Sequence, residues 1–234
     1  MSVNNNVDVI NIMEIIERVE NFAREYDLFK AHDKLLIACS GGPDSMALVD
    51  IFQKLSVKYK LEIIVAHAEH GIRKESSLND AWYVKNYCEQ KNIPFFMEHL
   101  NVLEHLKTEK LSVETLARKL RYQFLRKIAK AQNATKIVTA HHLNDQAETV
   151  LMRMMRGTGL QGLKGIDYMR DGVIIRPILD IERADIEAYC EEHKLTPRID
   201  ATNLETIYTR NKIRLELIPY MKENFNSNVT ESIV

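Results

Sequence analysis

The amino-acid sequence predicts an α/β fold: a doubly wound, mainly parallel sheet with helices on both faces. Short apolar runs alternate with longer segments of helical periodicity throughout residues 34–155. The first run, Lys34-Leu-Leu-Ile-Ala-Cys39, is apolar enough to be a strand buried in such a sheet. A glycine-rich turn joins this run directly to the helix after it. In folds of this class the ligand lies beyond the carboxyl ends of the strands.

The first predicted element is an amphipathic helix over residues 9–26, in which apolar side chains recur at helical spacing. Strands and helices then alternate, and serines are expected to cap two of the helices. Ser76 or Ser77 would be one N-cap, and Ser112 would precede the longest helix. The predicted strands cover residues 34–39, 62–67, 94–99 and 136–140, and the predicted helices cover residues 46–57, 77–91, 112–132 and 145–155.

The alternation ends after residue 155. Four glycines predict a flexible loop over residues 157–165. A helix is expected over residues 182–193, and a polar loop followed by a basic amphipathic helix within residues 200–222, whereas residues 224–234 show no clear organisation. The chain therefore divides into a lead-in (residues 1–33), one main domain (34–222) and an unassigned tail (223–234).

The composition is that of a globular protein, with 45% hydrophobic and 28% charged residues. The 32 lysines and arginines nearly balance the 33 aspartates and glutamates, so a nucleic-acid partner would have to be recognised by local basic patches. Cys39, Cys88 and Cys190 are far apart, which favours reduced structural thiols over disulfides or a zinc site. No stretch resembles a signal peptide or a membrane span, so we expect a cytoplasmic protein with no membrane partner.

The turn after the first strand has the composition of a phosphate-binding loop. Glycines let the backbone present successive N–H groups to an anion, and the following helix adds its positive N-terminal end. The motif lacks the lysine of a Walker A loop. A carboxylate beside a phosphate is repelled unless Mg²⁺ lies between them, which makes Asp44 a candidate magnesium ligand. The alternative is a tight turn in which Asp44 only caps the helix. The motif consists of Ser40, Gly41, Gly42, Pro43, Asp44 and Ser45.

Polar residues also follow the second and fourth predicted strands, and their loops should open onto the same crevice as the phosphate loop. Asp145 and Glu148 are three residues apart, so a helix places both on one face, and His141 comes just before them. These groups could bind a cationic substrate, hold a metal or transfer protons. Alternatively, Asp145 is only a helix N-terminal charge and Glu148 a solvated residue. Zinc is disfavoured, because His67-Ala-Glu69 lacks the P-C-x-x-C half of the deaminase signature.

The S-G-G-x-D-S motif resembles the signature of the PP-loop, or N-type ATP pyrophosphatase, superfamily. Five further motifs follow in order and together resemble the tRNA(Ile)-lysidine synthetases, over nearly all of residues 34–222. They are H-A-E-H-G-I-R from His67, E-T-L-A-R-K-L-R-Y from Glu114, H-H-L-N-D-Q-A-E-T and its continuation from His141, I-R-P-I-L from Ile175, and Y-T-R-N-K-I-R from Tyr208.

This resemblance implies a PP-loop ATPase fold and a ligase that uses ATP and Mg²⁺. ATP would adenylate C2 of the wobble cytidine in a tRNA(Ile) with a CAU anticodon. The side-chain amine of L-lysine would then displace AMP, giving lysidine, AMP and diphosphate. The family usually continues into further tRNA-binding domains, which we expect to lie outside this chain. A homodimer is left open.

By the same resemblance, Ser40 to Ser45 bind ATP and Asp44 acts with Mg²⁺. His141, Asp145 and Glu148, with Arg118 or Arg121, would line the adenylation and lysine sites. A lysine ammonium is stabilised by carboxylates, and a developing pyrophosphate by arginine. Two positions depart from the family pattern, Glu69 and Asn144, where the family usually or often has aspartate.

The candidate tRNA contacts are basic residues, most of them in the second half of the chain, whereas Arg126, Lys127 and Lys130 are better explained as a solvated helix face. Two other functions stay open. A PP-loop tRNA sulfurtransferase with an iron–sulfur cluster would carry C-x-x-C pairs, which this chain lacks, and a non-catalytic nucleotide-binding or tRNA-binding module would not need the acidic residues. The candidate tRNA contacts are His70, Arg73, Arg153, Arg156, Arg210 and Arg214.

Overall fold

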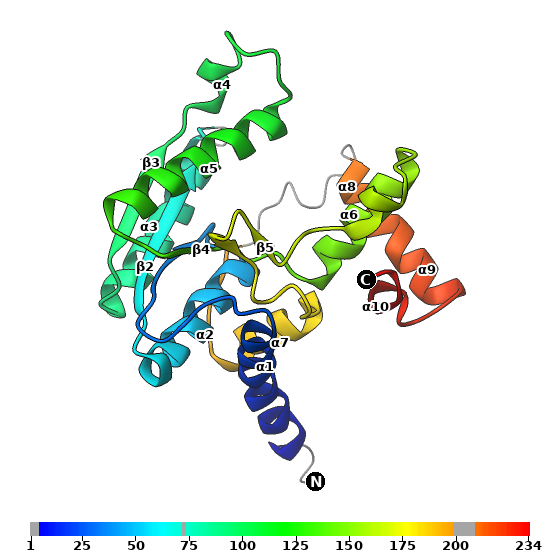
Figure 1. Ribbon diagram of the computed structural model, residues 1–234, viewed down its shortest axis with the longest axis horizontal. Coiled ribbons are helices and arrows are strands. Elements are labelled where there is room, and N and C mark those ends of the chain that lie inside the picture. The colour runs from blue at the N-terminus through cyan, green and yellow to red at the C-terminus, as the bar shows by residue number, and fades with distance from the viewer. Residues whose placement is uncertain (1–4, 72–73, 199–208) are drawn as a thin grey trace.

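The computed structural model describes residues 5–71, 74–198 and 209–234 of the chain (Figure 1). One six-stranded sheet forms its centre, with the strand order β3-β2-β1-β4-β6-β5. All neighbouring strands pair in parallel except β5, which runs antiparallel to β6 at the edge. The predicted doubly wound, mainly parallel sheet is therefore confirmed. The strands are β1 (Lys34–Ala38), β2 (Glu62–Glu69), β3 (Phe95–His99), β4 (Lys136–Val138), β5 (Met169–Arg170) and β6 (Ile174–Ile175).

The central strand β1 is buried on both faces, because its alternate side chains enter two different cores. Leu35 and Ile37 pack on one side and Leu36 on the other. Helices cover both faces of the sheet. Side chains of α1 (Asn5–Glu25), α2 (Pro43–Tyr59), α3 (Lys74–Gln90) and α7 (Arg183–Glu192) form the first core, and α5 (Val113–Ala131) with the short α4 (Val102–His105) contributes to the second.

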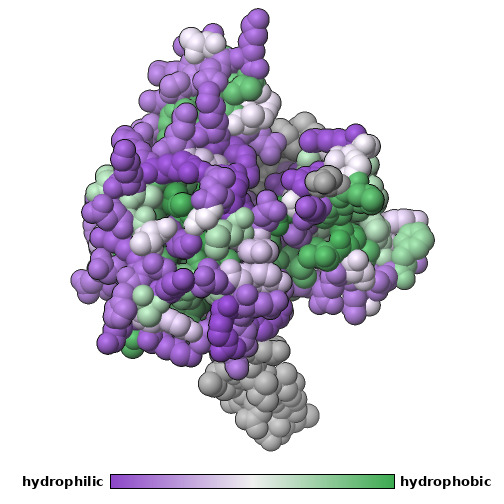
Figure 2. Space-filling view, in the orientation of Figure 1, coloured by the Kyte–Doolittle hydropathy of each residue, from purple (hydrophilic) through white to green (hydrophobic). Residues whose placement is uncertain are grey.

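A third, smaller core lies beyond the end of the sheet, where the C-terminal segment packs against α6 (Leu143–Met155). Ala147 and Leu151 of α6 contact Ile213 and Ile218. Figure 2 shows apolar surface gathered over this region, where the exposed hydrophobic residues include Met154, Met155, Tyr220 and Phe225. The segment comprises α8 (Thr209–Lys212), the π-helical turn Ile213–Leu217, α9 (Ile218–Asn224) and α10 (Val229–Ile233).

Several predicted boundaries were wrong. Helix α2 begins at Pro43 and not at residue 46, because proline at the first helical position needs no hydrogen-bond partner for its nitrogen. Helix α3 begins at Lys74, so Ser76 and Ser77 lie inside it and are not N-caps. Ser112, in contrast, caps α5 by accepting a hydrogen bond from the Thr115 amide at 3.2 Å.

The region after α6 is also more ordered than predicted. Residues Leu160–Lys164 form a 3₁₀ turn inside the expected flexible loop. The expected unorganised stretch 224–234 contains α10, which packs against α6. Part of the predicted polar loop, residues 199–208, lies outside the described residues. Within the described part of the chain, no helix combines the length and the apolar character that crossing a bilayer requires.

Candidate functional site

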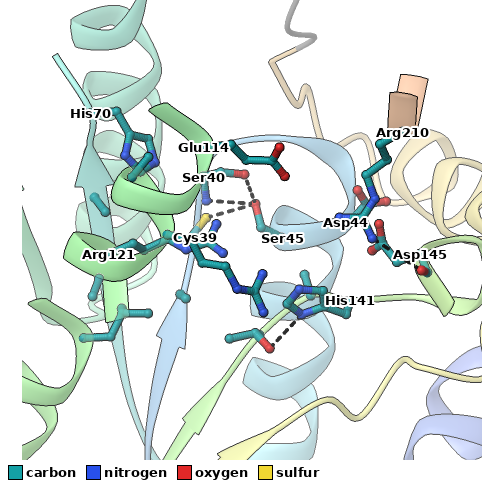
Figure 3. A pocket seen from close by; sticks show the side chains of 18 residues that line it. Cys39, Ser40, Asp44, Ser45, His70, Glu114, Arg121, His141, Asp145 and Arg210 are labelled. Carbon is teal, nitrogen blue, oxygen red and sulfur yellow. Dashed lines mark hydrogen bonds between the residues drawn. The ribbon is translucent and has the colours of Figure 1, made fainter. Parts of the chain in front are cut away.

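A cavity of about 370 Å³ opens at the carboxyl ends of β1, β2 and β4 (Figure 3). It confirms that the loops after these three strands share one crevice. The phosphate-loop residues and Asp145 lie on one side of it, and Arg121 reaches it from α5 on the other (Figure 3). The polar residues of its lining are Ser40, Asp44, Ser45, His70, Glu114, Arg118, Arg121, Thr139, His141, Asp145 and Arg210.

The phosphate loop is held in shape by its own second serine. The Ser45 hydroxyl accepts hydrogen bonds from the amides of Ser40 at 3.1 Å and Gly41 at 3.2 Å, and it donates to the Gly42 carbonyl at 3.0 Å. Gly41 has φ +91°, and a Cβ there would lie 3.2 Å from the Val84 side chain of α3. Only glycine fits this turn without strain. Pro43 and Asp44 belong to the first turn of α2, so the helix N-terminus faces the cavity.

Two carboxylates and one buried imidazole stand beside this loop. His142, 1% exposed, lies between the first turns of α2 and α6. Its Nε2 is 3.8 Å from Asp44 Oδ2 and 3.5 Å from Asp145 Oδ2. Asp145 also accepts the His142 backbone N–H at 3.3 Å. The sequence predicted both carboxylates but not His142. The position of His142 directly before a helix turn that contains an acidic residue is the signal that could have identified it.

The two carboxylates differ electrostatically. Burial, with a smaller contribution from Asp145, raises the pKa of Asp44 above its ordinary value despite His142 and Arg183 nearby. Burial alone would also raise the pKa of Asp145, but His142 and the guanidiniums of Arg210 and Arg214 outweigh it and lower this pKa. Asp145 is therefore the more firmly anionic of the pair.

His141 lines the cavity as an uncharged imidazole. Burial lowers its pKa to about 3, and the arginines around the cavity reinforce this against the opposing effect of Asp145. Its Nδ1 lies 3.1 Å from the Thr139 hydroxyl. At neutral pH this side chain can accept or donate a hydrogen bond but adds no charge.

Glu148 has a different environment from Asp145. It is fully buried and does not line the cavity. Its carboxylate accepts Arg210 Nε at 2.9 Å and Arg214 Nε at 2.6 Å. Arg214 also reaches Asp145 Oδ1 at 3.4 Å. The structure thus brings the predicted acidic residues and two of the predicted tRNA-contacting arginines into one network, which ties α6 to the C-terminal segment.

The other candidate tRNA contacts are scattered. His70 lines the cavity. Arg153 donates to the Gly165 carbonyl at 2.7 Å, and Arg156 is exposed at the far end of α6. Arg73 lies outside the described residues.

The contacts of Arg126 and Lys127 agree with their interpretation as part of a solvated helix face. Arg126 pairs with Asp171 and Lys127 with Glu98 on the surface.

Asn144, to which no role was given, accepts the Arg183 amide at 2.9 Å. Glu69 is buried, accepts the Gly71 amide at 2.8 Å and pairs with His99. These contacts give Asn144 and Glu69 roles in holding loops at the carboxyl edge of the sheet.

A second cavity, of about 630 Å³, lies against the phosphate loop and also reaches Ser40 and Asp44. Helix α7 and the segment after it form its other wall. The Arg198 amide donates to the Gly41 carbonyl at 2.9 Å, and its side chain pairs with Asp80 at 3.4 Å. Sequence reasoning missed this wall, because its residues belong to no glycine-rich or acidic motif. Its charged members are Asp80, Arg183, Glu187, Glu191, Arg198 and Arg214.

Comparisons with known proteins agree with this geometry. The tRNA(Ile)-lysidine synthase of Clostridioides difficile (strain 630) is 54% identical over 220 residues, which are 94% of this chain and 48% of that protein. Proteins of the same name from Clostridium tetani and Thermosipho africanus are 47% and 43% identical over 92% and 91% of this chain, and over 46% and 49% of their own length. The chain therefore spans about half the length of the curated relatives it matches.

Two solved structures share the fold at low sequence identity. A U34-tRNA thiolase, NcsA, from Methanococcus maripaludis superposes with a TM-score of 0.80 at 17% identity, over 96% of this chain and 77% of that one. An NH3-dependent NAD synthetase from Campylobacter jejuni gives a TM-score of 0.54 at 15% identity, over 94% of this chain and 89% of that one. A family model described as a PP-loop domain matches residues 12–221. Since that match covers most of the 234 residues, the chain belongs to the PP-loop domain family.

Proposed function

We propose that this chain is the ATP-dependent catalytic part of a tRNA(Ile)-lysidine synthase, with residues 34–222 as its catalytic domain. It would adenylate the wobble cytidine of a tRNA(Ile) with a CAU anticodon and join L-lysine to it. The observation that carries the proposal is one cavity in which the phosphate loop, Asp44 and Asp145 face Arg118 and Arg121. The identity of 54% to a relative of that name supports it.

In the first step, the cytosine O2 attacks the α-phosphorus of ATP, the bond to the bridging oxygen breaks, and diphosphate leaves. The N-terminus of α2 and the Ser40 hydroxyl, which lines the same cavity, are suited to hold the phosphates, whereas the amides of Ser40 and Gly41 hold the loop in shape. Such donors, fixed before the reaction, stabilise negative charge as it develops on the leaving group. His141 stays neutral beside them and so places no further cation or anion at the reacting base.

Magnesium fits this site. Asp44 Oδ1 is buried and has no hydrogen-bond partner among the described residues, and the anionic Asp145 shares the partner His142 with it. Mg²⁺ prefers one or two carboxylates together with substrate phosphates. Asp44, with Asp145 nearby, would hold the ion. Bound there, it would offset the charge of the phosphates.

In the second step, the lysine side-chain amine bonds to C2, the bond from C2 to the adenylate oxygen breaks, and AMP leaves with that oxygen. The incoming ammonium must first lose a proton, which passes to solvent, so that the free amine attacks. Asp145 is the best-placed anion to bind the ammonium, because its pKa is held low and it faces the cavity. Glu148 is better suited to hold Arg210 and Arg214 than to bind substrate, since both of its oxygens are already paired.

The test is to incubate the 234-residue chain with ATP, lysine and an anticodon stem-loop RNA containing the CAU loop. We expect AMP formation that needs the RNA, and an RNA mass gain equal to lysine minus water. Omitting lysine should leave RNA-dependent exchange between ATP and diphosphate. AMP release that is indifferent to the RNA would contradict the proposal.

The cysteines distinguish this function from sulfur transfer. Cys39, Cys88 and Cys190 are buried free thiols in the first core. Burial raises the pKa of Cys39 to about 11 and those of Cys88 and Cys190 to about 12. Thiols of this kind are poor nucleophiles and poor metal ligands at neutral pH. Appearance of sulfur in the RNA product would favour the thiolase function instead.

A further inference from the structure

Tyr122 of α5 lies at the centre of a group of arginines. Three guanidinium carbons lie over its ring, with Arg118 at 5.2 Å, Arg121 at 5.4 Å and Arg170 at 4.3 Å from the ring centroid. Arg176, only 2% exposed, adds a fourth positive charge that acts on Tyr122. We call Arg118, Arg121, Arg170 and Arg176 the arginine cluster.

The arginine cluster carries more positive charge than the protein neutralises. Within the described ranges, Arg118, Arg121 and Arg176 form no ion pair with a carboxylate, and Arg170 reaches only the exposed Asp171, at 3.8 Å. Arg176 uses a guanidinium nitrogen to donate to the Asp167 carbonyl, while its buried Nε has no partner. Burial lowers the pKa of both Arg121 and Arg176, and neighbouring arginines of the cluster add smaller contributions in the same direction.

An aromatic face offsets part of this repulsion, because the ring quadrupole attracts cations. It does not supply a negative charge. Guanidiniums collected in this way, with only Arg170 paired to a carboxylate in the described part of the chain, are suited to a bidentate anion such as phosphate. Arg118 and Arg121 line the 370 Å³ cavity, so an anion that binds them would lie within it.

The phosphate loop belongs to the opposite side of the cavity from Arg121 (Figure 3). The cavity therefore has two sides suited to anions: the N-terminus of α2 on one, guanidiniums on the other. The first already provides for the phosphates of ATP. We propose that the arginine cluster binds a backbone phosphodiester of the RNA next to the reacting cytidine, and that Tyr122 is a positioning residue for it. This inference rests on the proposed function and assigns the RNA a second anchor.

A phosphodiester at this point would explain how one base is presented alone. Proteins reach RNA bases where they are unstacked, and a splayed nucleotide needs its backbone fixed on one side. Binding of the adjacent phosphate by the arginines of α5 would orient the base toward ATP, which the phosphate loop would bind on the other side of the cavity. It would also neutralise charge near His141, whose low pKa owes part of its shift to Arg176, Arg121 and Arg118.

The test compares Arg170→Gln with wild type, using the anticodon stem-loop RNA and fluorescence anisotropy over a range of salt concentrations. We expect R170Q to bind the RNA about 5–10-fold more weakly at low salt, with the slope of log K against log salt reduced by about one. ATP affinity should change less than about twofold, since Arg170 is not among the residues that line the cavity with the phosphate loop. Arg24→Gln, an exposed arginine on α1, is the matched control and should match wild type.

Two tyrosine variants separate positioning from folding. Tyr122→Phe keeps the ring face and should bind RNA like wild type, whereas Tyr122→Leu should lose affinity and slope as R170Q does. A melting curve for each variant checks that the fold persists. Equal loss in Y122F and Y122L would show that the ring face is not the positioning feature.

An RNA with a neutral methylphosphonate in place of the phosphate 5′ or 3′ of the cytidine gives the decisive comparison. Wild type and R170Q should bind one of these two RNAs equally, because that RNA lacks the phosphate charge that the arginine cluster would bind. A penalty for R170Q that persists with both RNAs, or that falls on ATP binding instead, would overturn the inference. If wild type binds RNA well but R170Q does so equally, only this inference fails. If wild type binds no RNA at low salt, the proposed function fails with it.

Discussion

Asp44 and Asp145 are the same residue type, both in the first turn of a helix, yet their surroundings separate their chemistry. Asp44 has an unpartnered buried oxygen and a raised pKa, which suits a group waiting for a cation. Asp145 is surrounded by positive partners and has a lowered pKa. These different surroundings make Asp145 a stable anion and leave Asp44 dependent on a cation for its charge.

Asp44→Asn should abolish adenylation and leave the fold intact. The amide keeps the size of the side chain but removes the charge that would hold Mg²⁺, so we expect RNA-dependent AMP formation to fall at least about 100-fold, as when one electrostatic partner of a transition state is lost. Asp27→Asn, an exposed aspartate that pairs only with Lys30 at the surface, is the matched control. Normal AMP formation by D44N with an unchanged melting curve would remove Asp44 from the mechanism.

Asp145→Ala should act on the amine substrate. The ammonium of lysine would lose its nearest anion, so we expect the lysine concentration for half-maximal turnover to rise about tenfold or more, equal to roughly 1.4 kcal/mol. ATP binding should be largely retained, because the phosphate-loop contacts do not involve Asp145. Calorimetry that finds lysine binding unchanged in D145A would require another anion for this substrate.

His141 should make the folded chain less stable in mild acid. The pKa of His141 is about 3 in the folded state and about 6.5 in the unfolded state. At a pH between these values the unfolded state binds a proton at His141 and the folded state does not. Stability then falls as pH drops below about 6.5, by up to about 1.4 kcal/mol per pH unit from this group. In urea titrations at pH 7.5 and 5, His141→Gln should show a shallower loss than wild type. His105→Gln, at an exposed position, should not; an equal slope in H141Q would show that His141 titrates normally.

The site residues that could be predicted from the sequence were those whose positions a motif fixed. Asp44, Asp145 and His141 lie where the phosphate loop and the strand-four loop predicted. Glu148 was expected beside Asp145 at the crevice, and the three-residue spacing does place both on one face of α6. Sequence spacing cannot reveal that Arg210 and Arg214, more than sixty residues later, take up the Glu148 carboxylate.

Helix α6 is joined to the C-terminal segment by charge as well as by the small apolar core. Glu148 is the only one of the three main partners that is fully buried; Arg210 and Arg214 keep 30% and 22% of their side chains exposed. Burial raises the cost of leaving any of these charges unpaired. The network therefore fixes where α8 and the π-helical turn sit, and with them the Arg210 side chain that lines the cavity.

Glu148→Gln should loosen this segment. Removing one partner of a buried ion pair costs about 3–5 kcal/mol, and the partial exposure of both arginines reduces our expectation to about 2–3 kcal/mol, or roughly 5–10 °C in melting temperature. Hydrogen exchange should accelerate in residues 209–224 more than in α2. Glu98→Gln, which breaks the surface pair with Lys127, should cost less than about 1 kcal/mol. Unchanged exchange in the segment would mean that the apolar core alone holds it.

The long elements were predictable because each repeats one pattern over several turns or strand residues. Strands β5 and β6 were missed, since two residues carry no periodicity. Helix α10 and the 3₁₀ turn at residues 160–164 were missed for the related reason that tertiary contacts with α6 stabilise them. Helix α2 was predicted to begin three residues too late, because the glycine motif was taken as loop throughout and Pro43 was not used as a helix start.

At the scale of the whole molecule, the two cavities meet at the phosphate loop and share Ser40 and Asp44. Their charged linings come from α2, α3, α5, α6, α7, the residues after α7 and the C-terminal segment, so elements far apart in the sequence contribute to one region. Arginines are concentrated there too, with Arg118, Arg121 and Arg210 at the first cavity and Arg183, Arg198 and Arg214 at the second. These arginines lie in the same linings as several carboxylates, so charges of both signs gather around the phosphate loop.

This concentration has a consequence for tRNA selection. A lysidine synthase must reject a methionine tRNA that shares the CAU anticodon, and contacts near the reacting base are identical for the two. Discrimination must come from elsewhere in the tRNA, at about 1.4 kcal/mol of differential contact for each tenfold preference. We expect these 234 residues to bind and exchange ATP, but to bind full-length tRNA(Ile) weakly and with less than about tenfold preference over the methionine tRNA. Filter binding of both tRNAs at one fixed salt concentration is the measurement, because phosphate contacts make affinity salt-dependent. Tight and strongly selective binding would place a recognition surface for the tRNA body on this chain, away from the two cavities.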